Sequence, residues 1–167
     1  KPVIVECNSE HKFKLTKASL QAATTKKTKL LILNSPSNPT GLVYTEKELE
    51  QIAQYARENP QVYIISDDIY NRLVFTGEAL APHILKIAPD LKSRTLCING
   101  VSKTFSMTGW RIGWAIGEEN LIRAMSDYIS QSTSSACSIS QKASVVALEQ
   151  CEQDVVHAMK LLKERRD

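Results

Sequence analysis

One lysine, Lys103, lies between two apolar stretches, 95–98 and 112–116, that are typical of buried strands. A lysine amine becomes a nucleophile when burial or a neighbouring cation keeps it uncharged. Arg111 follows eight residues later and could supply that cation, or could bind a phosphate with its planar guanidinium. The spacing alone equally allows a surface lysine at the end of a strand.

Other polar side chains follow two further apolar stretches of the sequence. Asn38 lies in a segment rich in turn-forming residues after the run 30–33, and Asp67 and Tyr70 follow the run 62–65. Open α/β sheets bind their ligands at the carboxyl ends of the strands. We therefore expect these side chains to meet the lysine segment around one crevice.

Together these residues offer an amine, a carboxylate, a phenol, an amide and a guanidinium. This set suits an aldehyde on a pyridine ring that carries a phosphate. The amine would form a Schiff base, and the carboxylate would keep the ring nitrogen protonated so that the ring accepts electrons. Each residue also has a simpler interpretation: Asn38 as a turn former, Asp67 as a helix N-cap and Arg111 as the partner of a surface carboxylate.

Composition restricts the class of protein. The chain has 167 residues, of which 43% are hydrophobic and 23% charged, and its net charge is +3. These values are typical of one soluble globular domain. The charge is too small and too evenly spread to indicate a nucleic-acid or an acidic-membrane partner. No apolar run approaches the length of a membrane span, so we expect neither nucleic acid nor membrane to be bound.

The cysteines indicate neither a metal site nor a disulfide framework. Cys7, Cys97, Cys137 and Cys151 form no CxxC pair, and no histidine lies at metal-ligand spacing from any of them. Cys97 lies in an apolar run, where a buried thiol behaves as a small hydrophobic group. We expect reduced cysteines, no metal and a cytoplasmic protein.

Hydrophobic periodicity predicts a fold of the α/β class. Apolar runs predict strands at 2–6, 30–33, 62–65, 95–98 and 112–116. Amphipathic patterns predict helices at 16–23, from a Thr45–Glu48 capping box to before Pro60, and at 118–130, 141–149 and 154–166. The run 30–33 has the continuous apolar character of a strand that is buried on both faces.

The order of these elements predicts a mostly parallel sheet. A strand, a helix and a strand between residues 30 and 65 indicate a parallel βαβ unit. The segment 102–110 is too short for a crossover helix, so the strand that follows it is expected to be antiparallel and at the edge.

Three segments of the chain resemble motifs of the class I (fold type I) pyridoxal-phosphate-dependent aminotransferases. Residues 100–113 are similar to the lysine attachment motif of that family at every defined position. Residues 35–41 resemble its asparagine loop, and residues 66–70 resemble its aspartate–tyrosine segment. The motifs occur in family order, cover essentially the whole chain and are nearest to the bacterial aspartate aminotransferase branch. The resemblance implies a three-layer α/β/α large domain.

The resemblance assigns catalytic roles to three residues. Lys103 would form a Schiff base with pyridoxal phosphate and then move the proton between the substrate and the cofactor. Asp67 would pair with the pyridine nitrogen, and Tyr70 would contact the ring oxygen O3′.

Three further residues would bind the cofactor without acting on the substrate. Asn38 would contact O3′ beside Tyr70, and Ser102 and Arg111 would bind the phosphate. The Asn38–Pro39 peptide bond is expected to be cis, as in relatives. One departure is Asp68, where relatives often have Glu, and we expect little consequence from it.

The implied activity is transamination between an amino acid, aspartate by resemblance of residues 107–111, and a 2-oxo acid such as 2-oxoglutarate. Residues 1–153 would be the central part of the large domain, and residues 154–167 would begin the helix that leads to a small domain. The chain starts without methionine, and we expect a fragment that is inactive alone. The full-length enzyme is expected to be a homodimer.

Several alternatives stay open. The specificity could be aromatic or prephenate-type, or the same cofactor could serve a lyase reaction. An aminotransferase-like sensor domain of a transcription regulator would show the same motifs. A plain nucleotide-binding α/β domain is disfavoured because the chain contains no GxGxxG or GxxxxGK[ST] segment.

Overall fold

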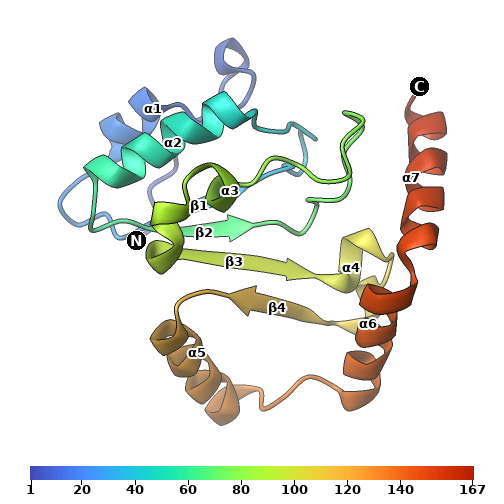
Figure 1. The fold of residues 1–167 in the computed structure, drawn as a ribbon. Coiled ribbons are helices and arrows are strands. Elements are labelled where there is room, and N and C mark those ends of the chain that lie inside the picture. The colour runs from blue at the N-terminus through green and yellow to red at the C-terminus, as the bar shows by residue number, and fades with distance from the viewer.

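The computed structural model describes the whole chain, residues 1–167. Its centre is a four-stranded sheet of order β1-β2-β3-β4 (Figure 1). The strands are β1 (Leu30–Asn34), β2 (Tyr63–Asp67), β3 (Thr95–Gly100) and β4 (Gly113–Ile116). The pairs β1–β2 and β2–β3 are parallel, and β3–β4 is antiparallel. The expected α/β class, with one antiparallel strand at the edge, is confirmed.

Seven helices lie around this sheet (Figure 1). They are α1 (Lys17–Ala23), α2 (Glu46–Glu58), α3 (Ile84–Ile87), α4 (Val101–Thr104), α5 (Glu119–Ser132), α6 (Ser138–Gln150) and α7 (Glu152–Arg166). Short 3₁₀ turns occupy Ser9–His11, Pro89–Arg94 and Thr108–Trp110. None of the helices combines the length and the apolar character that crossing a membrane requires.

Helix α2 begins where the sequence predicts. The Thr45 side chain accepts a hydrogen bond from the Glu48 amide, and the Glu48 carboxylate accepts one from the Thr45 amide. This capping box satisfies two amide groups that would otherwise lack partners at the start of the helix. Leu49, Ile52 and Ala53 then turn one face of α2 into the core.

The end of α2 is tied to the sheet by one arginine. Arg94 donates to the carbonyl oxygen of Ala56 at 3.1 Å and to that of Val62 at 2.7 Å. Its guanidinium therefore binds both the last turn of α2 and the residue that precedes β2. Because Arg94 itself precedes β3, this contact fixes the helix between two neighbouring strands.

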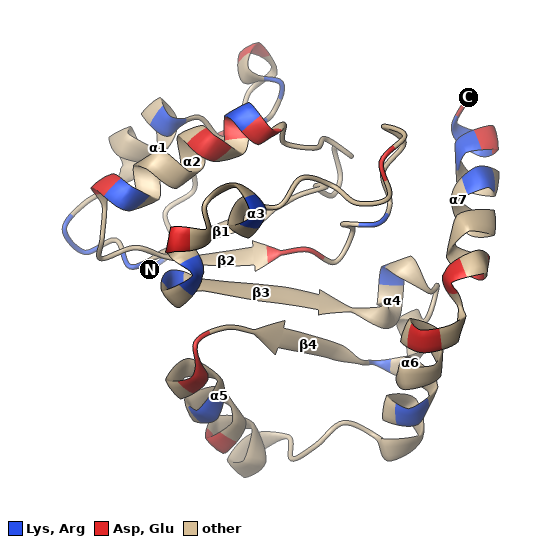
Figure 2. Ribbon diagram, viewed as in Figure 1, with Lys and Arg blue, Asp and Glu red and all other residues tan.

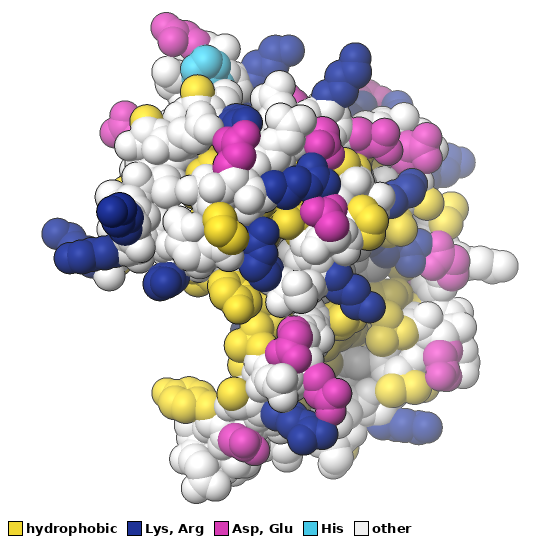
Figure 3. All heavy atoms as spheres, turned by 60° about the vertical axis from the view of Figure 1, so that its left-hand side comes forward, with side chains coloured by type: hydrophobic (Ala, Val, Ile, Leu, Met, Phe, Trp, Pro, Cys, Tyr) yellow, Lys and Arg dark blue, Asp and Glu magenta, His cyan; other side chains and the backbone are white.

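The core lies on one face of β1 and β2. Leu31, Leu33 and Ile64 point into it and pack with α1, α2 and α3. Ile32 points to the other face and is 64% exposed, so the expectation that this strand is buried on both faces is wrong here. The reason is that the helices α1 to α3 cover only one side of this part of the sheet. Figure 3 shows hydrophobic side chains gathered in a recess below the charged surface of the upper part of the molecule.

The strand expected at residues 2–6 does not form. This segment has no regular secondary structure, and Val3 and Ile4 are exposed. A β-branched run needs a neighbouring strand for its backbone hydrogen bonds, and no strand of this chain pairs with it. The remaining predicted strands and helices are all present, with ends shifted by a few residues.

The buried face of α2 yields a test of the fold. Replacement Ile52→Ala removes a fully buried side chain and is expected to lower the free energy of unfolding by about 2–5 kcal/mol. Gln51→Ala, at the adjacent exposed position, is the control and should change it by less than about 0.5 kcal/mol. Urea unfolding followed by circular dichroism measures both. Equal effects of the two substitutions would contradict the described core.

Candidate functional site

The carboxyl ends of β1, β2 and β3 lie level with one another. Asn34 pairs with Asp67 across β1 and β2, and Asp67 pairs with Ile98 across β2 and β3. The Asn34 side-chain amide donates to the Asp67 carbonyl at 3.0 Å, and the Asp68 amide donates to the Ile98 carbonyl at 2.8 Å. The segments that follow these strands are therefore brought to one edge of the sheet. Figure 2 shows acidic residues at the end of β2 and a basic residue in α4, just beyond β3.

Lys103 lies in α4, a single helical turn that follows β3 directly. The turn starts close to the backbone of the returning chain: a Cβ on Gly100 would lie 2.7 Å from the Ile112 carbonyl oxygen. Glycine is therefore required at this position. Lys103 is half-buried, and its amine lies 5.7 Å from the centre of the Tyr70 ring.

Tyr70 also meets Asn38. The Asn38 side-chain amide lies 3.4 Å from the Tyr70 hydroxyl oxygen, to which it donates a hydrogen bond. Both residues line a hollow of about 500 Å³, together with Phe75 and with Arg166 from α7. The Asn38–Pro39 bond is cis, as the resemblance implies. Three of the predicted site residues, Asn38, Tyr70 and Lys103, are thus in one chain of contacts.

Asp67 lies at the same edge, at the end of β2. Its carboxylate accepts a hydrogen bond from the Ile69 amide at 3.3 Å, which orients the carboxylate at the start of the turn to Tyr70. The side chain is half-buried, so it remains within reach of a ligand at this edge.

The two predicted phosphate ligands precede and follow Lys103 in the sequence. Ser102 is next to Lys103 in α4 and is half-buried. Arg111 is exposed, and its guanidinium donates to the Thr108 carbonyl at 2.8 Å. The backbone of Arg111 has φ 57°, a left-handed conformation that reverses the chain between the turn 108–110 and β4.

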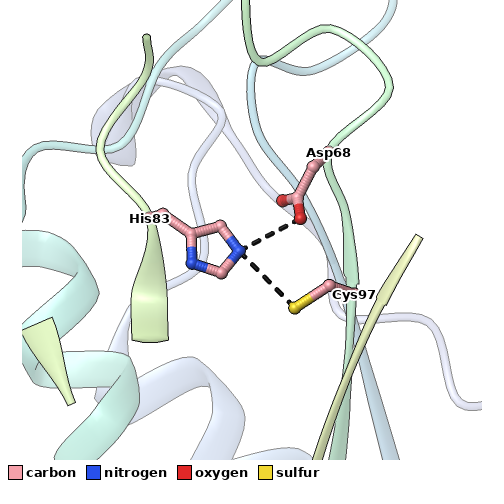
Figure 4. Close-up of side chains that lie close together, drawn as sticks. All are labelled: Asp68, His83 and Cys97. Atoms are coloured by element: carbon pink, nitrogen blue, oxygen red, sulfur yellow. Dashed lines mark hydrogen bonds and ion pairs between the residues drawn. The ribbon is translucent and has the colours of Figure 1, made fainter. Parts of the chain in front are cut away.

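Sequence reasoning missed one cluster near this edge, made of Asp68, His83 and Cys97 (Figure 4). His83 Nε2 lies 3.0 Å from the Asp68 carboxylate and 3.7 Å from the Cys97 sulfur. Sequence spacing does not reveal this contact, because His83 and Cys97 come from separate segments and His83 lies in a stretch with no clear periodicity. No histidine lies at metal-ligand spacing from Cys97 in the sequence, but the fold brings His83 next to it.

The electrostatics of this cluster are dominated by the carboxylate. The hydrogen bond from His83 to Asp68 raises the pKa of His83 above its ordinary value, with the Cys97 contact acting in the same direction. Asp68 is buried, and its second oxygen accepts a hydrogen bond from the Ser66 hydroxyl at 2.7 Å. A buried carboxylate is costly unless both oxygens find donors, and here both do.

Comparison with known proteins identifies the family. The sequence profile of the family described as aminotransferase class I and II matches residues 1–167. The chain belongs to this family.

Individual relatives agree with this assignment. A probable aspartate/prephenate aminotransferase of Rickettsia typhi is 53% identical over 88% of this chain. An asparagine–oxo-acid transaminase of Streptococcus mutans is 47% identical over 99% of it. The crystal structure of an aspartate aminotransferase from Rhizobium meliloti superposes on the whole chain with a TM-score of 0.95 and 41% identity. The chain spans 37% and 41% of the two curated relatives and 42% of the solved chain.

The residues at the sheet edge fit the cofactor of this family, pyridoxal phosphate. A half-buried amine, a phenol, an amide and a carboxylate lie at the ends of adjacent strands. The amine suits an aldehyde, the phenol and the amide suit a ring oxygen, and the carboxylate suits a protonated ring nitrogen. Ser102 and Arg111 would bind the phosphate. Arg111 could do so after its guanidinium leaves the Thr108 carbonyl oxygen.

The contact between Asn38 and Tyr70 yields a test of this site. Tyr70→Phe removes the hydroxyl and should raise the dissociation constant for pyridoxal phosphate about tenfold, the effect of one lost hydrogen bond. The free energy of unfolding should change by less than about 0.5 kcal/mol, because the hydroxyl lies in a half-buried position. Absorbance titration measures the first and urea unfolding the second. Tyr128→Phe, at a residue that is 76% exposed on α5, is the matched control, and an equal effect there would count against the site.

Proposed function

We propose that this chain carries the cofactor-binding centre of a pyridoxal-phosphate-dependent aminotransferase. Such an enzyme moves an amino group from an amino acid to a 2-oxo acid. The observation that carries the proposal is the convergence of Lys103, Tyr70 and Asn38 at the carboxyl edge of the sheet, beside Asp67. The names of the relatives support it.

The proposed substrates are aspartate and a 2-oxo acid such as 2-oxoglutarate. Aspartate aminotransferases are among both the curated relatives and the solved structures. Prephenate is a second candidate acceptor, favoured by the aspartate/prephenate names of relatives that are 51–53% identical. Assays of the longer protein with aspartate and each acceptor separate these specificities. Loss of the amino acid without formation of a new amino acid would instead indicate a lyase.

Bound pyridoxal phosphate supplies an aldehyde that condenses with amines and a ring that accepts electrons. In the proposed mechanism Lys103 would hold the cofactor at its aldehyde through Nζ, and the same amine, once the substrate amine has replaced it, would take up and return a proton at the substrate α-carbon. The Asp67 carboxylate would hold a proton on the ring nitrogen. Tyr70 would be the third residue with a catalytic role, because its hydroxyl would donate to the ring oxygen.

The remaining cofactor contacts orient the ring. The Asn38 amide donates to the Tyr70 hydroxyl and would share the ring oxygen with it. Ser102 and Arg111 would bind the phosphate, for which a hydroxyl and a planar guanidinium are suitable donors. These three residues would keep the ring in register with the Lys103 amine.

We further propose an organisation for the longer protein. Residues 1–153 form the central part of its large domain, and residues 154–167, within α7, begin the helix that leads to a small domain. The longer protein is a cytoplasmic homodimer, and the present chain alone lacks turnover. The share of each relative that the chain spans supports the existence of a longer protein.

Reduction of the bound cofactor with borohydride tests the central residue. Incubation with pyridoxal phosphate, reduction and peptide mass spectrometry should place the adduct on Lys103, because its amine is half-buried beside Tyr70. The adduct at this site should disappear in Lys103→Ala, whereas Lys142→Ala, at an exposed position on α6, should leave it unchanged.

Two results would contradict the proposal. The first is an adduct spread over surface lysines and unaltered by Lys103→Ala in both this chain and the longer protein. The second is full transaminase turnover by Lys103→Ala.

A further inference from the structure

The cluster of Asp68, His83 and Cys97 has no part in the proposed cofactor contacts (Figure 4), yet Asp68 is the next residue after Asp67. Asp68 is only 7% exposed. One of its oxygens accepts from the Ser66 hydroxyl at 2.7 Å, and the other lies 3.0 Å from His83 Nε2. Both carboxylate oxygens of Asp68, the residue after Asp67, therefore have a hydrogen-bond partner.

The three side chains could be taken for a metal site, because their ligand atoms lie within 4.8 Å of one another. The histidine argues against this. His83 Nδ1 accepts a hydrogen bond from the Leu85 amide at 3.1 Å, so the ring proton is on Nε2 and points to Asp68. A metal on Nε2 would displace that proton to Nδ1, where it would face the Leu85 N–H.

The cluster also differs from a nucleophilic triad. In a triad, the histidine contacts the nucleophile through one ring nitrogen and the carboxylate through the other. Here Asp68 and Cys97 meet the same nitrogen, Nε2. His83 cannot pass a proton from the Cys97 thiol across its ring to Asp68.

Asp68 directly follows the last residue of β2 and continues its pairing with β3. The Asp68 amide donates to the Ile98 carbonyl at 2.8 Å, and the Asp67 carbonyl accepts from Asn34 at 3.0 Å. The Asp67 carboxylate accepts from the Ile69 amide. Successive side chains of a strand point to opposite faces, so fixing Asp68 on the core face fixes the direction of Asp67 on the other.

We propose that His83 is a positioning residue for Asp67, acting through the Asp68 carboxylate. The N–H donor on Nε2 holds the Asp68 carboxylate beside β3, where the Asp68 amide also pairs with Ile98. The inference rests on the proposed function for its consequence, since Asp67 is the residue proposed to pair with the ring nitrogen.

Amide hydrogen exchange tests the positioning without any cofactor. The Ile69 amide reports on the Asp67 carboxylate, to which it donates. In His83→Ala, exchange at Ile69 should be about tenfold faster than in the wild type, as expected when a local hydrogen-bonded turn loosens. His83→Gln keeps an N–H donor for Asp68 and should stay within about threefold of the wild type.

Two further variants complete the exchange experiment. His157→Ala, at an exposed histidine on α7, is the matched control and should have no effect. If His83→Ala gives no cooperative melt, His83→Leu replaces it, because leucine fills the volume but donates no hydrogen bond. We expect His83→Leu to speed up exchange at Ile69 by the same factor as His83→Ala.

A cofactor titration then tests the consequence. His83→Ala should raise the dissociation constant for pyridoxal phosphate about tenfold, a loss comparable to one charge-assisted hydrogen bond. It should have no such effect on an analogue in which the ring nitrogen is replaced by a C–H group, because that analogue offers nothing to Asp67.

The outcomes separate the two claims. Failure of the wild type to bind pyridoxal phosphate contradicts the proposed function. Intact binding, with equal exchange and equal affinities in wild type and His83→Ala, overturns the role of His83 alone. Stoichiometric Zn²⁺ binding by the wild type that is lost in Cys97→Ala also overturns it, because it would show that the cluster is a metal site.

Discussion

The position of the site residues depends on the level at which three parallel strands end. Asn34, Asp67 and Ile98 are register partners across β1, β2 and β3. Parallel strands that end level with one another send their following loops to the same edge. A shift of one residue in β2 would turn Asp67 into the core and Asp68 outwards. The register therefore decides which of two adjacent carboxylates faces the site.

The register is maintained by groups outside the strands. Arg94 ties the end of α2 to the start of β2, and the α2 face packs on the core side of β1 and β2. At the opposite end, Asn34 and the Asp68 amide continue the pairing beyond the regular ladder. Gly100 permits the close passage of Ile112 that turns α4 towards Tyr70. The contacts that maintain the strand register therefore also position the site residues.

Much of this arrangement follows from local patterns in the sequence. The strand at 30–33 and the start of α2 at Thr45 are determined by interactions between residues that are close in the sequence. The short segment between β3 and β4 predicts their antiparallel pairing for the same reason. The position of Asn38 and Tyr70 at one edge follows from the parallel order alone. Their roles, and that of Lys103, come from the family resemblance.

Other features depend on contacts that no local pattern encodes. His83, the residue before α3, meets Asp68 and Cys97 only in the folded chain, because the three residues are separated by 14 or more positions in pairs that include His83. The exposure of Ile32 depends on which face of the sheet the helices cover. A continuous apolar run has no periodicity that would indicate the covered face. The missing strand at 2–6 lacks a pairing partner, which is a property of the sheet and not of the segment.

Backbone amide chemical shifts during a pyridoxal phosphate titration test the central claim most directly. The account predicts that the largest changes fall on Asn38, on 67–70 and on 102–103, with Arg111 following. These segments are distant in sequence and meet only at the proposed edge. Changes confined to exposed lysine-rich segments such as 26–29, in this chain and in the longer protein, would contradict the claim that the three strand ends form one cofactor site.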